Sequence, residues 1–151
     1  MPPDFDPAAA HRFFSADCFN KTWDLIEKTN RTREDDQRML QCAFASLWHW
    51  TQREDCTDTQ FSIGYWQISR VYALLGESVN AAEYADLSLS HAAHLAPFYR
   101  GYAHEALARA AMVEGRPERA AQHLKEAFAL ASQVPDVEER SMLEKDLQSL
   151  R

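Results

Sequence analysis

Glycine is scarce in this chain: only 4 of its 151 residues are glycine, whereas 23 are alanine. Glycine permits tight turns and phosphate-binding loops, and alanine is the residue that most favours an α-helix. The GxGxxG and GxxxxGK patterns of nucleotide-binding proteins are also missing. These absences argue against a β-sandwich, a Rossmann unit or a P-loop enzyme, and they predict helices joined by short loops.

Basic charge and long apolar runs are lacking as well. The chain has 16 Lys and Arg residues against 23 Asp and Glu residues, a formal net charge of −7. Nucleic-acid binding generally needs a basic surface, so this balance disfavours it. No apolar run reaches the length of about 18 residues that a membrane span needs, and the N-terminus does not resemble a signal peptide. We therefore expect neither nucleic acid nor membrane as a partner.

Cysteine occurs only three times, at Cys18, Cys42 and Cys56, without CxxC spacing. An odd count with this spacing matches neither a disulfide framework nor a zinc site. Reduced thiols in a cytoplasmic protein are expected, with no cofactor and no metal. The length and the hydrophobic content of 46% predict a single domain over residues 1–151.

Prolines and capping residues divide the chain into about seven helical segments, so the predicted fold class is all-α. Apolar residues recur every three or four positions, and no segment alternates with period two. The predicted organisation is an N-terminal tail at 1–6, a divergent first hairpin at 7–53, further hairpins at 59–95 and 98–134, and a final helix at 136–150.

Helix ends can also be predicted from single residues. Gly76 and Gly115 are expected to end two of the helices, because glycine adopts the left-handed conformation that a helix C-terminus often needs. Side chains that accept a hydrogen bond from the first turn mark the starts. The expected N-caps are Asp6, Thr32, Asp58 or Thr59, Ser78 and Asp136.

Gly76 and Gly115 also mark an internal repeat, because they lie 39 residues apart in similar surroundings. Before each glycine a large residue is followed by a leucine-like residue and a small residue, and further small residues follow the glycine. These positions are Tyr65, Ile68, Ser69, Tyr72, Ala81 and Ser88 around Gly76, and His104, Leu107, Ala108, Ala111, Ala120, Leu124 and Ala127 around Gly115.

This pattern resembles the tetratricopeptide repeat, in which small side chains let paired helices pack closely. The resemblance covers residues 62–133 well and 13–53 weakly, since Glu27 stands at a small position there. The period also exceeds the usual value of about 34 residues. The resemblance implies an α-solenoid of stacked antiparallel hairpins with a C-terminal capping helix and a concave groove that binds peptides.

Two equivalent helix faces carry the candidate binding site. Trp66 and Arg70 are four residues apart and share a face, and Glu105 and Arg109 repeat this spacing. With Tyr102, they occupy positions that would face the groove of the resembled family. Arginine suits carboxylates or phosphates and tryptophan offers a flat apolar surface, so the partner is expected to be a protein or peptide, with an anionic group as the fitting chemistry.

Structural roles for the same residues remain open. Glu105 and Arg109 would then form a salt bridge on the helix surface, and Trp66 would pack against the first hairpin. Trp66 and Glu105 also stand where the family's carboxylate clamp has polar or basic residues. A clamp for peptide C-termini is therefore not expected.

His49 and Trp50, near the end of the second predicted helix, are secondary candidates for the same groove. Packing in the core is the alternative role of this aromatic cluster. Cys42 shares a helix face with His49, but the helix rise separates them by about 10 Å, too far for a nucleophile and its base.

No catalytic residue is predicted from local spacing. His91 and His94 have a spacing that can chelate a metal, but no acidic residue lies within one helical turn. We expect them to lie on the outer side of the fold or between repeats rather than in a metal site.

The sequence thus predicts a cytoplasmic, non-catalytic adaptor or scaffold that binds another protein through a concave groove. Two alternatives stay open. One is a protein that binds or hydrolyses a small anionic ligand in a closed pocket at the same residues. The other is a self-associating module, such as a homodimer, because the last helix carries a short apolar stripe.

Overall fold

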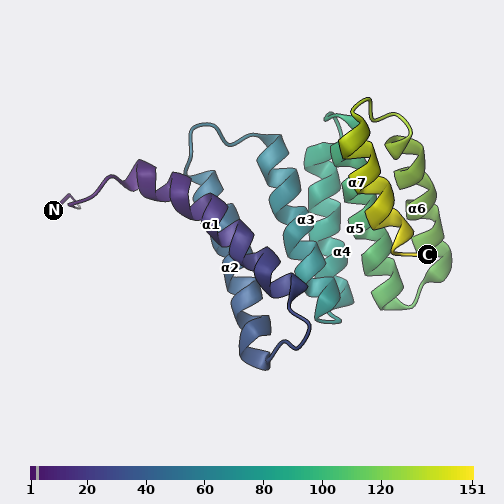
Figure 1. The fold of residues 1–151 in the computed structure, drawn as a ribbon, viewed down its shortest axis with the longest axis horizontal. Helices are drawn as coiled ribbons and strands as arrows, with labels where there is room; N and C mark the ends of the chain where they lie inside the picture. Colours follow the sequence, from purple (N-terminus) through teal and green to yellow (C-terminus); the bar gives the residue numbers. More distant parts are fainter. Residues whose placement is uncertain (3) are drawn as a thin grey trace.

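A computed structural model describes residues 1–2 and 4–151, and in these residues the chain forms seven α-helices and no strand (Figure 1). The all-helical class and the number of helices predicted from the sequence are confirmed. The finer prediction, a solenoid of stacked hairpins, stays a prediction. The helices are α1 (Pro7–Glu27), α2 (Arg33–Thr51), α3 (Asp58–Leu74), α4 (Ser78–Ala92), α5 (Pro97–Glu114), α6 (Pro117–Ala131) and α7 (Val137–Gln148).

Three of the predicted N-caps are present with their hydrogen bonds. Asp6 accepts from the Ala8 amide at 2.9 Å, and Asp136 accepts from the Glu139 amide at 2.9 Å. Thr32 accepts from the Asp35 amide at 3.1 Å, and Asp35 accepts from the Thr32 amide at 2.9 Å. This reciprocal pair satisfies two backbone donors that the first turn of α2 would otherwise leave without partners.

Two other N-caps were predicted wrongly by one or two residues. Helix α3 is capped by Thr57, not by Asp58 or Thr59, because Gln60 reaches back to accept from the Thr57 amide at 2.8 Å. Helix α4 has Glu77 at its N-cap, and Ser78 is already helical.

The glycine-ended turns are built alike. Gly76 has a φ of 77° and Gly115 a φ of 78°, both in the left-handed region. After each glycine the next amide bonds back to the preceding helix, from Glu77 to Tyr72 at 3.0 Å and from Arg116 to Ala111 at 2.9 Å. Both glycines thus end their helices as predicted.

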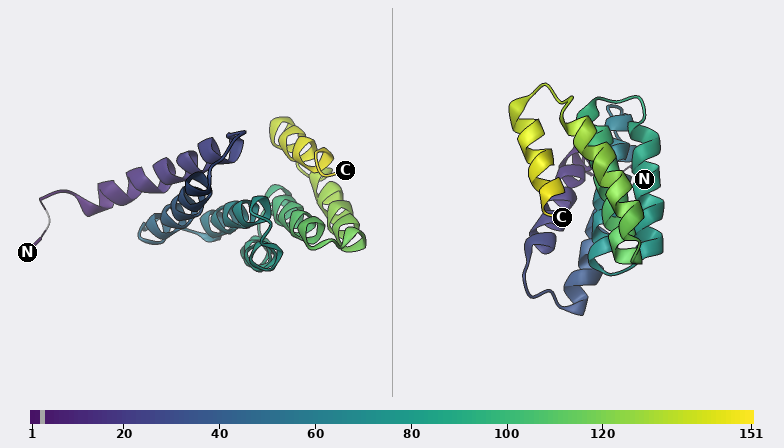
Figure 2. Two further views of the ribbon diagram at one scale, coloured as in Figure 1. Left: turned by 90° about the horizontal axis from the view of Figure 1, so that it is seen from below. Right: turned by 90° about the vertical axis from the view of Figure 1, so that its right-hand side faces the viewer.

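Helix packing places α3 and α5 at the centre. Each helix packs on the next one along the chain, α3 also packs on α5, and α7 packs on both α5 and α6. In Figure 2, α1 and α7 lie on the same side of α3 and α5, and α4 lies on the opposite side. Helix α1 projects beyond the rest of the fold at its N-terminal end (Figure 1).

The core changes in character along the molecule. Between α2 and α3 it contains the fully buried side chains of Met39, Ile68 and Val71. Between α5 and α6 it is made largely of alanines such as Ala108 and Ala127, which allow a close approach of the two helices. None of the described helices is both long and apolar enough to cross a membrane.

Candidate functional site

A buried carboxylate lies at the centre of the site. Glu105 on α5 is 0% exposed, and Trp66 on α3 donates its indole N–H to Oε2 at 2.7 Å. Arg109, one turn further along α5, donates Nε–H to Oε1, and Nη1 of Arg70 lies 3.6 Å from the same oxygen. A carboxylate is stable in such a place only when it is paired and hydrogen-bonded. The network therefore joins α3 firmly to α5.

The structure brings together all five primary candidates predicted from the sequence: Trp66, Arg70, Tyr102, Glu105 and Arg109. Glu105 and Arg109 do form the i,i+4 salt bridge of the structural alternative, but Glu105 is fully buried and Arg109 is only 16% exposed, so the pair does not lie on the surface. Trp66 does contact α1, where the Trp23 ring lies 5.5 Å away between centroids.

Glu105 balances only part of the positive charge of Arg70 and Arg109, because one carboxylate faces two guanidinium groups. Burial, followed by repulsion from Arg109, lowers the pKa of Arg70 from its ordinary value. Among the described residues, Nε of Arg70 is buried without a hydrogen-bond partner. The prediction of two arginines free to bind an anion must therefore be revised: both are committed to Glu105, with one positive charge in excess.

Tyr102 connects this network to the last helix. Its hydroxyl donates to Oδ2 of Asp146 on α7 at 2.7 Å. Burial, that hydrogen bond and the negative charge of Asp146 raise the pKa of Tyr102 far above its usual value, so it remains a neutral donor. Asp146 was not predicted as a site residue, because its 44-residue separation from Tyr102 leaves no local signal.

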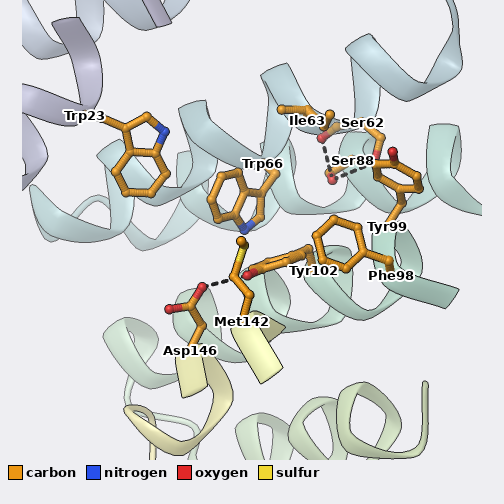
Figure 3. A pocket seen from close by; sticks show the side chains of 10 residues that line it. All are labelled: Trp23, Ser62, Ile63, Trp66, Ser88, Phe98, Tyr99, Tyr102, Met142 and Asp146. Atoms are coloured by element: carbon orange, nitrogen blue, oxygen red, sulfur yellow. Dashed lines mark hydrogen bonds between the residues drawn. The ribbon is translucent and has the colours of Figure 1, made fainter. Parts of the chain in front are cut away.

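A hollow of about 420 Å³ opens beside these residues, bordered by α1, α3, α4, α5 and α7. This volume suits a small organic ligand or a side chain with its neighbours. Figure 3 shows Trp66 and Tyr102 in the middle of the hollow, with Trp23 on one side and Phe98 on the other. The lining residues are Trp23, Ser62, Ile63, Trp66, Ser88, Phe98, Tyr99, Tyr102, Met142 and Asp146.

A second hollow, of about 170 Å³, lies further along the same two central helices. Arg70 on α3 and Arg109 on α5 line it, together with Met112 and with Leu150 from the C-terminus. The two hollows thus follow one another along α3 and α5, with Glu105 buried between them.

The secondary candidates lie elsewhere, and neither lines the hollow beside Trp66. His49 lies against α1, where its Nδ1 is 2.9 Å from Nδ1 of His11. Trp50 lines a separate hollow of about 260 Å³ between α1, α2 and α3. The Arg53 guanidinium lies 3.8 Å from the centroid of the Trp50 ring. The expectation that His49 and Trp50 share the groove of Trp66 is corrected, because His49 faces α1 and Trp50 lines a neighbouring hollow that shares only Ile63 with the larger one.

Other reactive side chains are engaged in structural contacts. His91 and His94 bond to the two carboxylate oxygens of Asp58, at 2.7 and 3.0 Å. This acid comes from the start of α3, far from the histidines in the sequence. Within residues 1–2 and 4–151, no group of three or more His, Cys, Asp or Glu side chains is placed to hold a metal ion.

The three thiols are free and share one feature, partial burial. Burial raises the pKa of Cys18, Cys42 and Cys56 above the usual thiol value. A raised pKa lowers the thiolate fraction at neutral pH, so none of them has the environment of a catalytic nucleophile.

Comparison with known protein families, curated proteins and solved structures found no match to this chain.

Proposed function

We propose that this protein is a non-catalytic adaptor that binds an extended peptide segment of another protein along the face formed by α3 and α5. The observation that carries the proposal is the alignment of two hollows, of about 420 and 170 Å³, along the same pair of helices. One offers aromatic surface and the other two arginines, so a single peptide strand would meet both in succession.

The repeat equivalence of α3–α4 and α5–α6 supports a tetratricopeptide-like arrangement. Tyr65 contacts Tyr84 with ring centroids 6.0 Å apart, and the residues 39 positions later, His104 and His123, also contact each other. Equivalent residues thus occupy equivalent places between the paired helices. In the resembled family this arrangement creates a peptide-binding groove.

The buried network would prepare the site for binding. Glu105 holds the Trp66 indole and the Arg109 guanidinium in fixed positions before any partner arrives. Preorganised side chains lose less conformational entropy on binding, which leaves more of the interaction energy as affinity. Glu105 is therefore a positioning residue in this proposal, and the partner contacts its neighbours.

The two ends of the groove differ in charge, and this difference supports a partner with an acidic group at one end. Arg70 and Arg109 share one carboxylate, so an excess positive charge remains beside the smaller hollow. A carboxylate or phosphate of the partner would be stabilised there by charge-assisted hydrogen bonds.

Selection from a random peptide library tests the adaptor directly. Peptides enriched on the wild-type protein are compared with Met142→Glu, which places a charge in the larger hollow at a side chain already 56% exposed. Val79→Glu is the matched control, because Val79 is 80% exposed on α4 and lines neither hollow. Loss of binding with Met142→Glu and retention with Val79→Glu supports the adaptor. No enrichment, or equal binding by both variants, refutes it.

A thermal-shift screen distinguishes a small anionic ligand at the same residues. Phosphate and short dicarboxylates would raise the melting temperature of the wild-type protein by mass action if one of them were the natural ligand class. The rise should then disappear in Arg109→Gln, while Arg119→Gln, an exposed change on α6, should leave it unchanged.

A second candidate function is self-association, which the exposed aromatics of α1 and α2 favour. Phe13, Phe14 and Trp48 are 61%, 42% and 55% exposed. Phe13 and Phe14 lie in the N-terminal half of α1, and Trp48 contacts His11 of that helix with ring centroids 5.4 Å apart. Exposed aromatic groups of this kind often mark an interface. Light scattering across protein concentration tests it: a mass that rises with concentration, and falls with Trp48→Ser, indicates a dimer.

A further inference from the structure

We propose that the larger hollow receives a methylated or quaternary ammonium group, carried by a peptide side chain or by a small organic cation. This inference rests on the proposed function only in taking the face of α3 and α5 as the binding face. It goes further by naming the chemistry of the group that enters.

The first support is a continuous aromatic wall. The Trp66 ring lies 5.5 Å from Trp23 and 5.1 Å from Tyr102, and the Phe98 ring lies 5.1 Å from Tyr102, all between centroids. Figure 3 shows these four rings, from α1, α3 and α5, in a row that runs from Trp23 past Trp66 and Tyr102 to Phe98. The face of an aromatic ring carries partial negative charge, and aromatic cages are the usual receptors of quaternary ammonium groups.

The second support is the hydrogen bonding of two of these rings. Trp66 donates its indole N–H to Glu105 and Tyr102 donates its hydroxyl to Asp146, both at 2.7 Å. A donor bonded to a carboxylate is polarised, which moves electron density into its ring. The Trp66 and Tyr102 faces are therefore more attractive to a cation than rings bonded to neutral acceptors.

The third support is the charge that borders the hollow. Asp146 is its one charged lining residue among those described, and no Lys or Arg there lies within ion-pair distance of it. Arg70 and Arg109 line the other hollow, where both face Glu105, so the carboxylate that borders the larger hollow is that of Asp146.

The protein itself already places a cation against this wall. The Arg70 guanidinium lies 5.9 Å from the centroid of the Trp23 ring, within the range of a cation–π contact. Trp23 thus accepts a delocalised cation on the side that Arg70 approaches, while the hollow lies beside the same ring.

The polar groups of the lining favour a methylated cation over a primary ammonium. The hydroxyl of Ser88 donates to the Ser62 carbonyl at 2.9 Å and lies 3.4 Å from the Ser62 hydroxyl, so both hydroxyls belong to the contact between α3 and α4. A primary ammonium keeps three donors that need acceptors, whereas a quaternary ammonium has none and is more weakly hydrated. The hollow therefore fits a cation with an apolar surface.

Choline and its neutral isostere 3,3-dimethyl-1-butanol provide the decisive probes. Both are titrated into the wild-type protein, and binding is followed by tryptophan fluorescence and by calorimetry. We expect choline to bind about tenfold more tightly than the alcohol, the size of a cation–π contribution in a partly desolvated site. Equal affinities, or tighter binding of the alcohol, would overturn the proposal.

Two variants test the groups that supply the selectivity. Asp146→Asn keeps a side-chain acceptor for the Tyr102 hydroxyl and removes the charge, so choline should weaken several-fold while the alcohol is unaffected. Phe98→Leu removes one ring at nearly equal volume and should also weaken choline. Glu138→Gln, an exposed change on the same helix as Asp146, is the matched control and should change neither affinity.

A peptide with one trimethyllysine distinguishes the source of the cation. If it binds more tightly than choline and than the same peptide with unmodified lysine, the ammonium belongs to a protein partner. If choline binds more tightly, it belongs to a small molecule. Peptide selection that succeeds while every cation fails would leave the adaptor standing and overturn this inference. Choline binding without any selected peptide would support the cation site and overturn the adaptor.

Discussion

The helix pairs α3–α4 and α5–α6 are related in the sequence by a spacing of 39 residues, yet their helices are held together by different chemistry. In α3–α4, the hydroxyl of Ser69 donates to the Ala81 carbonyl at 2.7 Å, and Tyr65 packs on Tyr84. In α5–α6, Ala108 stands at the position of the serine and Ala120 at that of Ala81, and Nδ1 of His104 lies 3.2 Å from Nδ1 of His123. The first pair relies on aromatic packing, on hydrogen bonds and on the contacts of His91 and His94 with Asp58. The second relies on close approach and on the contact between two partly buried histidines.

The candidate site contains two residues that this spacing relates and that differ in chemistry. Trp66 and Glu105 are equivalent positions 39 residues apart, and one donates a hydrogen bond to the other. Identical residues at both positions could not form this bond, because two indoles lack the acceptor and two carboxylates repel each other. The central contact therefore depends on the chemical difference between these two residues, and mutations can show how much each helix pair depends on it.

Removing the acceptor at the shared contact should have the largest effect. Glu105→Ala leaves the Arg70 and Arg109 guanidinium groups without their carboxylate and the Trp66 N–H without an acceptor. We expect the free energy of unfolding to fall by about 3–5 kcal/mol, the usual cost of breaking a buried ion pair. Urea denaturation measures the loss, with the exposed Glu126→Ala as control. A loss below about 1 kcal/mol, like that of a surface pair, would show that the network does not hold α3 to α5.

The two glycine turns offer a matched comparison with a smaller effect. An added Cβ would meet no atom within 4 Å at Gly76 or Gly115, so the cost of Gly→Ala comes from the left-handed backbone alone. We expect each substitution to lower the free energy of unfolding by about 1–2 kcal/mol. Thermal or urea unfolding of the two variants should give similar losses. A clear difference would mean that the turns are not equivalent.

Ser69→Ala makes the first pair resemble the second, where Ala108 stands at the equivalent position. The variant loses the buried hydrogen bond to the Ala81 carbonyl, and we expect a destabilisation of about 1 kcal/mol. Ser90→Ala, at an exposed hydroxyl of α4, should cost less and serves as control. No measurable loss at position 69 would show that close packing alone holds both pairs.

Mild acid should weaken the second pair before the first. Burial is the main cause that lowers the pKa of His104 and His123, and the mutual repulsion of the two rings lowers that of His123 further. Arg100 and Arg119 also lower these values, whereas Glu126 and Asp86 oppose the shift. Because the folded pKa lies below the unfolded value of about 6.5, the contribution to stability is complete above that pH and is lost as the pH falls through the folded pKa.

His104→Tyr/His123→Tyr copies Tyr65 and Tyr84 and should reduce this acid sensitivity. Denaturant midpoints at pH 7.5 and 5.5 give the difference for the wild type and the variant. Some sensitivity should persist, since burial also lowers the pKa of His49. A variant as acid-sensitive as the wild type would place the sensitivity in another part of the molecule.

Local signals explain what could be predicted from the sequence. Helix spacing and the 39-residue period predicted one cluster, because the residues concerned lie on neighbouring faces of two helices. These residues are Trp66, Arg70, Tyr102, Glu105 and Arg109. Caps such as Asp6 and Thr32 were predictable because capping depends on residues within one turn. The shift of the α3 cap to Thr57 shows the limit of this reasoning, since several adjacent residues could serve.

Contributions from the ends of the chain could not be predicted. Trp23 on α1 and Asp146 on α7 complete the hollow, but their place depends on how the first and last helices pack on the central pair. The burial of Glu105 and the pairing of Asp58 with His91 depend on the same long-range packing. No spacing along one helix contains that information.

The hollow has one more consequence, for the cooperativity of folding. Its lining joins α1 to α7, the first and last helices, whereas the helices otherwise pack mainly on near neighbours in the chain. A chain of near-neighbour contacts can open from either end independently. A ligand in the hollow would contact both α1 and α7 and so link the two ends of this series of helices. Amide hydrogens of α1 and α7 should therefore gain protection from exchange together when the ligand binds.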